Sequence, residues 1–252
     1  MTAIHPDLAG ASIFVTGGAS GIGAALVAGF VAQGAKVAFV DLLDPADQVA
    51  TLSATATHLP IGLQCDITDT GALEHAMDQA VAAHGPFKAV VNNAANDQRY
   101  ALEAVTPEIW DDVQAVNLKS YFFSSQLAAA RMGPNGSIVN YTSISYMVGT
   151  PSLIPYATAN AGISGLTRSL ARELGGKGMR VNAIAPGWVL TEKQEKLWAT
   201  PEGKANFLKT QCLPRHMRPD DLVGPTLFLA SDASAMMTGQ TMVVDAGVVT
   251  TG

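Results

Sequence analysis

A glycine-rich loop close to the start of the chain constrains the fold more than any other feature. It joins an apolar run, a turn that holds three glycines, and a helical pattern: 12–15, Gly17, Gly21, Gly23 and 22–33. Strand, glycine turn and helix in this order present backbone N–H groups and the positive end of a helix to a pyrophosphate. A plain glycine turn is the alternative. Asp41, which follows a second β-like run over 36–40, favours the binding loop.

The loop and Asp41 together predict which dinucleotide binds. Gly17 permits the tight turn, Gly21 lets the backbone approach phosphate, and Gly23 lets helix and strand pack closely. The Asp41 carboxylate is placed to accept hydrogen bonds from both adenine-ribose hydroxyls, and it would repel a 2′-phosphate. No lysine or arginine in the loop or directly after Asp41 offsets this repulsion. We therefore expect NAD rather than NADP.

Apolar runs rich in β-branched residues alternate with helical patterns along the chain. The strand candidates lie at 12–16, 36–40, 61–65, 89–92, 137–141, 180–185 and 241–245. The helical patterns lie at 22–33, 70–84, 107–131, 157–174 and 219–229. This alternation predicts a parallel sheet with helices on both faces. We expect an α/β fold, a single doubly wound Rossmann domain over residues 1–252 with a seven-stranded, mostly parallel sheet.

The overall composition argues against several classes of function. Hydrophobic residues make up 48% of the chain, enough for a sizeable core, and the net charge of −6 argues against nucleic acid or an anionic membrane as partner. No apolar stretch reaches the length of a membrane span, and the first ten residues show no secretory signal. The histidines show no metal-ligand spacing, and Cys65 and Cys212 suggest no disulfide framework. We expect a cytoplasmic protein without a bound metal.

The segment 186–218 is the least regular part of the chain. It combines Trp188 and Trp198 with several lysines and arginines, and it carries a Pro-Glu-Gly turn signal. That composition predicts a mobile lid over a cleft rather than core.

A serine, a tyrosine and two asparagines form the candidate catalytic group. Ser143 and Tyr156 both follow the fifth strand candidate. Tyr156 and Asn160 are four residues apart on a predicted helix, so both side chains point from one face. Asn117 lies on an earlier predicted helix. A phenol with a pKa of about 10 removes protons poorly at neutral pH unless a cation lowers that pKa.

In this order, these landmarks resemble the short-chain dehydrogenase/reductase family in its NAD-dependent branch. The matching landmarks span 10–247 and comprise Thr16-Gly17-xxx-Gly21-x-Gly23, Asp66, Asn92-Asn93-Ala94, Asn117, Ser143, Tyr156 and Pro186-Gly187-xxx-Thr191. Within the family, the chain is similar to the bacterial NAD-dependent aldose (D-xylose-like) 1-dehydrogenases. The stretches that carry this closer likeness are 92–97, 142–145, 191–198 and 200–203.

The resemblance implies a role for each matching residue. Tyr156 is the general base that removes the hydroxyl proton, Ser143 orients the reacting oxygen, and Asn117 anchors a water in the proton-exit path. The implied cofactor-binding residues are Gly17, Ser20, Gly21, Ile22, Gly23, Asp41, Asp66, Ile67, Asn93, Ala94, Tyr156, Asn160, Pro186, Gly187, Val189 and Thr191. Asp66 is as well suited to cap the turn before Thr68. The resemblance also implies a homotetramer.

Asn160 departs from the family, which places lysine there to grip the nicotinamide ribose and to lower the pKa of the tyrosine. Asparagine still hydrogen-bonds ribose hydroxyls, but it supplies no positive charge. If the lysine shifts the pKa by about 1–3 units, its loss cuts the phenolate fraction near neutral pH roughly 10- to 1000-fold. Lys193 or Lys196 folding inward from the lid is one replacement, and solvated lid lysines are the alternative. Asn160 equally fits an inactivated variant.

The candidate substrate pocket is polar and aromatic, as a polyol requires. Its expected residues are Asn96, Arg99, Ser145, Tyr146, Trp188 and Trp198. A surface ion pair between Asp97 and Arg99 is the alternative for that part of the pocket.

Three functions remain open from the sequence. The leading hypothesis is an NAD-dependent dehydrogenase that oxidises the anomeric hydroxyl of an aldose to a lactone. The second is a dehydrogenase of a secondary hydroxyl of a sugar acid, which would give a ketone. The third is a catalytically impaired variant or a nucleotide-binding protein with vestigial catalysis, for which Asn160 is the only support.

Overall fold

Seven parallel strands form one sheet, and their order in it is β3-β2-β1-β4-β5-β6-β7. The structure is a computed structural model that describes residues 3–250. The strands are β1 Ser12–Thr16, β2 Lys36–Asp41, β3 Ile61–Gln64, β4 Phe87–Asn92, β5 Met132–Tyr141, β6 Arg180–Pro186 and β7 Thr241–Val244. Every neighbouring pair is parallel, so the sheet is fully rather than mostly parallel. The α/β Rossmann fold is confirmed.

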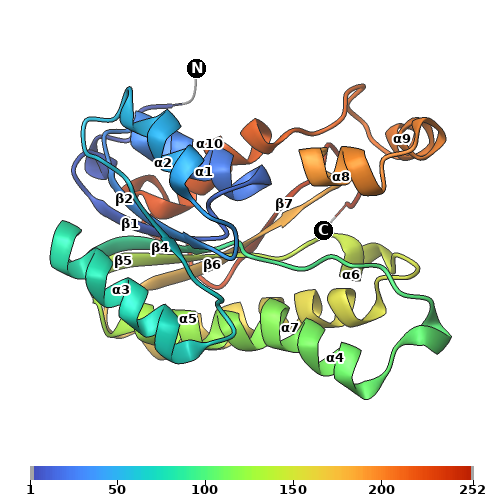
Figure 1. The fold of residues 1–252 in the computed structure, drawn as a ribbon, viewed down its shortest axis with the longest axis horizontal. Coiled ribbons are helices and arrows are strands. Elements are labelled where there is room, and N and C mark those ends of the chain that lie inside the picture. Colours follow the sequence, from blue (N-terminus) through green and yellow to red (C-terminus); the bar gives the residue numbers. More distant parts are fainter. Residues whose placement is uncertain (1–2, 251–252) are drawn as a thin grey trace.

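Helices cover both faces of this sheet (Figure 1), with α1, α2 and α10 on one face and α3, α5 and α7 on the other. The helices are α1 Gly21–Ala32, α2 Ala46–Ser53, α3 Thr70–His84, α4 Pro107–Gln114, α5 Ser120–Ala129, α6 Ser145–Val148, α7 Ile154–Gly175, α8 Glu192–Leu197, α9 Pro201–Leu208 and α10 Val223–Ala230. Short 3₁₀ turns lie at Pro6–Leu8, Leu102–Ala104, Pro219–Leu222 and Asp232–Ser234.

Three expectations about helices need correction. The pattern over 107–131 is not one helix, because a π-helical turn, η3 (Ala115–Lys119), separates α4 from α5. The pattern over 219–229 starts as a 3₁₀ turn before α10. The segment 186–218 contains two short helices, α8 and α9, each started by a threonine whose hydroxyl accepts a backbone N–H. No apolar period announces helices this short.

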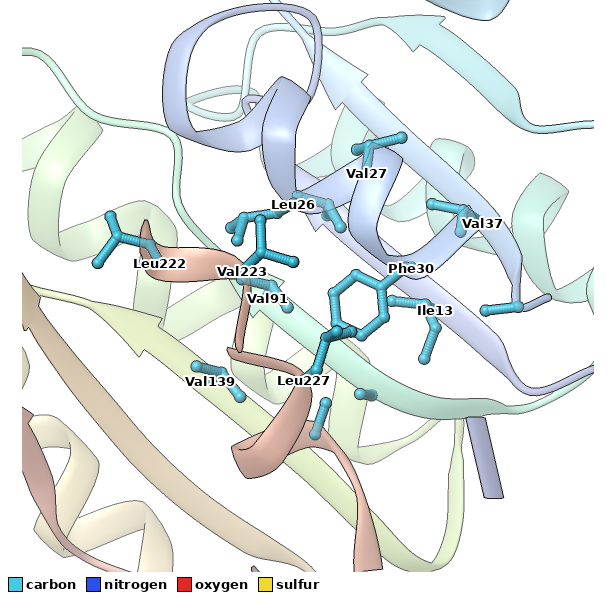
Figure 2. Packing of buried hydrophobic residues seen from close by; sticks show 14 of the residues in the cluster. Ile13, Leu26, Val27, Phe30, Val37, Val91, Val139, Leu222, Val223 and Leu227 are labelled. Carbon is cyan, nitrogen blue, oxygen red and sulfur yellow. The ribbon is translucent and has the colours of Figure 1, made fainter. Parts of the chain in front are cut away.

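A hydrophobic cluster holds α1 and α10 on one face of the sheet (Figure 2). The α1 residues Leu26, Val27 and Phe30 meet side chains from the strands and from the 222–227 region. Phe30 is fully buried, and burying such a side chain contributes about 1.5–3 kcal/mol. The labelled partners are Ile13, Val37, Val91, Val139, Leu222, Val223 and Leu227.

The opposite face buries a second cluster around Phe14, Leu73, Met77 and Ile138. With both faces packed, the sheet leaves its strand ends for chemistry. The sheet order reverses between β1 and β4, and in such sheets ligands bind outside the carboxyl ends of the strands at that point.

Candidate active site

One cavity of about 1580 Å³ extends along the carboxyl ends of the strands. It is lined by the glycine loop, by Asp41, by the segment after β6, and by Ser143 and Tyr156. Of the expected site residues, all but Tyr146 line this cavity. The structure therefore brings together segments that lie far apart in the sequence.

The glycines of the loop are required by close contacts. A Cβ on Gly23 would lie 1.7 Å from the Gly17 carbonyl oxygen, so helix α1 packs on the loop only without a side chain there. Gly17 has a φ of +71°, and its Cβ would lie 2.8 Å from the Ala94 Cα. Ser20 precedes α1 without capping it through its side chain, and the first turn holds no acidic residue. The N–H groups of this turn are thus suited to an anion.

Asp41 is 8% exposed, and each of its oxygens accepts one backbone N–H. The donors are Ala19 in the glycine loop, at 2.8 Å, and Leu43, at 3.0 Å. A carboxylate has about four lone-pair positions, so acceptor capacity remains for ribose hydroxyls. The fixed negative charge at the cavity wall disfavours a phosphate at this place.

Asp66 and Asn93 both hold backbone in the structure. The Asp66 carboxylate accepts the Thr68 N–H at 2.9 Å and the Thr68 hydroxyl at 2.7 Å, which is the turn-capping alternative. The Asn93 amide donates to the carbonyls of Thr16, at 3.1 Å, and Gly17, at 3.0 Å. Asn93 therefore fixes the glycine loop, while Asp66 still borders the cavity.

The segment after β6 is fixed by backbone contacts on two sides. The Pro186 carbonyl accepts the Ile144 N–H at 3.1 Å, and the Gly187 N–H donates to the Val244 carbonyl at 2.9 Å. A Cβ on Gly187 would lie 2.9 Å from Asp245, so glycine permits this approach. The Thr191 hydroxyl caps α8. The remaining cofactor candidates Ile22, Ile67, Ala94 and Val189 supply apolar wall.

Tyr156 lies in the first turn of α7. It lines the same cavity as Ser143, whose side chain hydrogen-bonds it. Burial and the nearby Asp97 carboxylate raise the pKa of Tyr156 to about 12, and hydrogen bonds with Asn160 and Ser143 oppose that rise. None of these four influences from the described residues is a cation. The phenol therefore needs help to ionise at neutral pH.

Asn160 is 2% exposed, and its amide donates to the Tyr156 carbonyl at 2.8 Å. Lys193 does not replace the missing charge, because its ammonium pairs with Asp97 at 2.7 Å. Lys196 borders the cavity from α8. Lys193 is half exposed and pairs with Asp97 on the loop after β4, so it is neither an unpaired solvated lysine nor a cation that acts on Tyr156.

The Asn117 side chain holds the loop after β4 in place by hydrogen bonds to its backbone. Its amide oxygen accepts the Asn96 N–H at 2.9 Å, and its amide nitrogen donates to the carbonyls of Asn96, at 3.1 Å, and Val113, at 2.9 Å. The residue lies in the π-helical turn and is 1% exposed. Its side chain thus fixes the position of Asn96 at the cavity wall.

A chain of polar contacts joins the segment 186–218 to Asp97 on the loop after β4. Trp188 donates to the Gln194 side chain at 2.8 Å, and Gln194 donates to Asp97. The Arg99 guanidinium lies over the Trp198 ring, 4.9 Å from its centre. Asp97 therefore pairs with the lid and not with Arg99.

Two expected substrate residues differ in their surroundings. The Ser145 hydroxyl is buried at the cavity wall and has no hydrogen-bond partner within residues 3–250. Tyr146 does not border the cavity, which corrects the expectation. Its hydroxyl oxygen accepts the Ser164 hydroxyl at 3.0 Å, because the side chain lies between α6 and α7.

Sequence reasoning missed Gln194 and Tyr121 as cavity residues. Gln194 lies on a short lid helix whose orientation no local pattern indicates. Tyr121 could have been predicted from the sequence, because it follows Asn117 by four residues and so shares a face of the predicted helix with it. Among residues 3–250, no cluster of three or more metal-ligating side chains is present, and no helix there has the length and apolar character to cross a membrane.

Comparisons with known proteins agree over nearly the full length. The family profile described as enoyl-(acyl carrier protein) reductase matches residues 17–249. A probable galactose dehydrogenase of Rhizobium meliloti is 50% identical over 250 residues, 96% of each chain. The D-xylose 1-dehydrogenase of Caulobacter vibrioides is 41% identical over 249 residues, 98% of each chain.

Solved structures show the same fold at similar length. A putative gluconate dehydrogenase from Agrobacterium tumefaciens superposes with a TM-score of 0.92 at 31% identity, covering 99% of this chain and 100% of that one. A short-chain dehydrogenase/reductase from Serratia marcescens superposes with a TM-score of 0.89 at 31% identity, covering 97% and 99%. The chain belongs to the short-chain dehydrogenase/reductase family, whose dehydrogenases use nicotinamide cofactors.

Proposed function

We propose that the protein is an NAD-dependent aldose 1-dehydrogenase. It would move a hydride from the anomeric carbon of an aldose sugar to NAD and release a sugar lactone. The observation that carries the proposal is the single cavity that joins the glycine loop and Asp41 to Ser143 and Tyr156. One relative named a probable galactose dehydrogenase, at 50% identity, and one named a D-xylose 1-dehydrogenase, at 41% identity, support a sugar as substrate.

The residues at the glycine-loop end fit a dinucleotide without a 2′-phosphate. The N–H groups at the start of α1 suit the pyrophosphate, and Asp41 suits the adenine ribose. Asn160 and the 186–191 segment border the part of the cavity that leads to Tyr156. A bound oxidised nicotinamide would supply the hydride acceptor and, until the hydride is transferred, a positive charge near the phenol.

The chain's own residues supply the proton chemistry. The Tyr156 oxygen, once deprotonated, takes the proton of the anomeric hydroxyl as the hydride leaves the adjacent carbon. Ser143 donates a hydrogen bond to the reacting oxygen and fixes its position. Ser145 and Asn96, whose backbone Asn117 holds at the cavity wall, offer polar side chains for the other sugar hydroxyls. Trp188 and Trp198 exclude water and offer apolar faces to the C–H side of the ring.

A second candidate is the oxidation of a secondary hydroxyl on a sugar acid. Arg99 favours it, because this cation borders the cavity and forms no ion pair among residues 3–250. The putative gluconate dehydrogenase among the solved structures is in keeping with that option. A catalytically impaired nucleotide-binding protein is a third reading and rests on Asn160 alone.

A substrate screen distinguishes these functions. Aldoses and sugar acids are offered with NAD or NADP at neutral and alkaline pH, and NADH or NADPH is followed by absorbance. Aldose oxidation with release of acid after lactone hydrolysis supports the first function, and ketone formation from a sugar acid supports the second. NAD binding without turnover on any sugar at either pH supports the third. The family resemblance further leads us to propose a cytoplasmic homotetramer.

A further inference from the structure

The Arg99 side chain is a feature of the cavity to which the proposed aldose oxidation assigns no contact. It lies on the loop after β4, is exposed and borders the cavity, with its guanidinium 4.9 Å from the centre of the Trp198 ring. Within residues 3–250 it forms no ion pair. A guanidinium carries five N–H donors in a planar fork, so Arg99 has donors to offer to a ligand.

The backbone on both sides of Arg99 is fixed. The Asn117 side chain holds Asn96 at its N–H and at its carbonyl, and the Tyr100 N–H donates to a backbone carbonyl between α6 and α7 at 2.9 Å. The contact with Trp198 engages the guanidinium through its charge and its face, whereas the donors lie at its edge. The loop and the tryptophan therefore hold the donors at the cavity wall without using them.

A hydrogen-bond acceptor lies on the same part of the wall. The Asp97 carboxylate borders the cavity, keeps 27% of its side-chain surface exposed and bonds to Lys193 and Gln194 at the start of α8. Trp198, the contact of Arg99, directly follows the end of α8. The two contacts lie four residues apart along α8, about 6 Å of helix rise. This wall thus presents a carboxylate acceptor and a guanidinium donor at neighbouring points.

An acceptor beside a donor suits hydroxyl groups better than it suits a carboxylate. A hydroxyl both donates and accepts, so neighbouring hydroxyls of one sugar can donate to Asp97 and accept from Arg99. A substrate carboxylate only accepts, and the Asp97 charge would repel it. Lys193 offsets part of this repulsion, so a sugar acid belongs among the probes.

We propose that Arg99 is a specificity-determining residue, whose guanidinium donates hydrogen bonds to one or two hydroxyls of the aldose that do not react. The Trp198 ring fixes the guanidinium, and Arg99 then selects sugars by the presence of those hydroxyls. The inference rests on the proposed function in taking a sugar as the ligand, and it does not depend on which residue is the base.

The test is a cycle that combines a protein variant with sugars that each lack one hydroxyl. D-Galactose, D-xylose and their monodeoxy analogues are offered with NAD at alkaline pH to the unmodified protein and to Arg99→Gln, and kcat and KM are measured. Arg168→Gln is the matched control, because Arg168 is exposed on α7 and lies outside the cavity wall. Thermal unfolding checks that both variants are folded.

We expect Arg99→Gln to lower kcat/KM for the parent sugar about 10-fold or more, mainly through KM, because hydrogen bonds from a charged group are lost. The analogue without the contacted hydroxyl should lose a similar factor with the unmodified protein and nothing further with Arg99→Gln. The other analogues should keep the full effect of the substitution. Arg168→Gln should leave every ratio unchanged.

An equal loss for the parent sugar and every deoxy analogue overturns the proposal and indicates that Arg99 only supports Trp198. No loss in Arg99→Gln overturns it as well, while turnover of the aldose leaves the proposed function standing. D-Galacturonate is the acidic probe. A preference for it over D-galactose that disappears in Arg99→Gln assigns Arg99 to a carboxylate and overturns the hydroxyl contact.

A failure of the proposed function is recognised separately. If no sugar turns over, NMR of the sugar signals measures dissociation constants from the NAD complex, and the same cycle is read from these constants. Binding that shows the coupling supports the Arg99 contact although the proposed reaction fails. Absence of both turnover and binding for every sugar contradicts the proposed function and the Arg99 contact together.

Discussion

At the scale of the residue, single atoms decide whether the glycine loop binds a dinucleotide. A Cβ on Gly23 would lie 1.7 Å from a backbone oxygen, so Gly23→Ala must displace the loop, and calorimetry should show NAD binding weakened about 10-fold or more. Gly165→Ala is the control, because nothing lies within 4 Å of its Cβ position. Asp41→Ala should bring the dissociation constants of NAD and NADP closer together, and equal constants in the unmodified protein would refute this role. Both residues could be predicted from sequence, since glycine spacing and a strand-ending carboxylate are local patterns. The contact of Gln194 with Asp97 could not, because it joins segments far apart in the chain.

At the scale of the element, α8 and α9 line the end of the cavity that we propose for the substrate. Trp188 links to this part through Gln194 and packs against Phe207 with ring centres 5.4 Å apart. Adding substrate to the NAD complex should therefore change tryptophan fluorescence, and Gln194→Ala should reduce that change by loosening the link to Asp97. A silent titration, with binding verified by calorimetry, would count against this placement. The lid over 186–218 stays a prediction, and its two helices were missed although Thr191 and Thr200-Pro201 are local helix-start signals, because helices this short show no apolar period. The break between α4 and α5 was likewise hidden, since apolar periodicity continues through it.

At the scale of the whole molecule, cofactor binding is linked to the stability of the sheet. NAD at about 100 times its dissociation constant should raise the free energy of unfolding by about 2.7 kcal/mol, which thermal unfolding detects. Tyr156→Phe should keep this stabilisation while losing turnover, because the ring keeps its shape and only the titrating oxygen is removed. Stabilisation by NADP equal to that by NAD at equal concentration would contradict the cofactor assignment. The seven strands and their face-covering helices were predictable because buried parallel strands read as continuous apolar runs. The ion pair of Lys193 with Asp97 could not be predicted, because it joins two segments that lie far apart in the sequence.

The pH dependence of kcat/KM tests the central claim, that Tyr156 is a base working without a cation. Burial and Asp97 raise its pKa to about 12, so activity of the unmodified protein should climb about tenfold per pH unit from neutral pH, less whatever the bound nicotinamide charge recovers. Asn160→Lys should lower that pKa by about 1–3 units and raise activity near neutral pH roughly 10- to 1000-fold, with a plateau at lower pH. NAD affinity should change less than turnover. A plateau already present near neutral pH in the unmodified protein, with no gain from Asn160→Lys, would contradict the account.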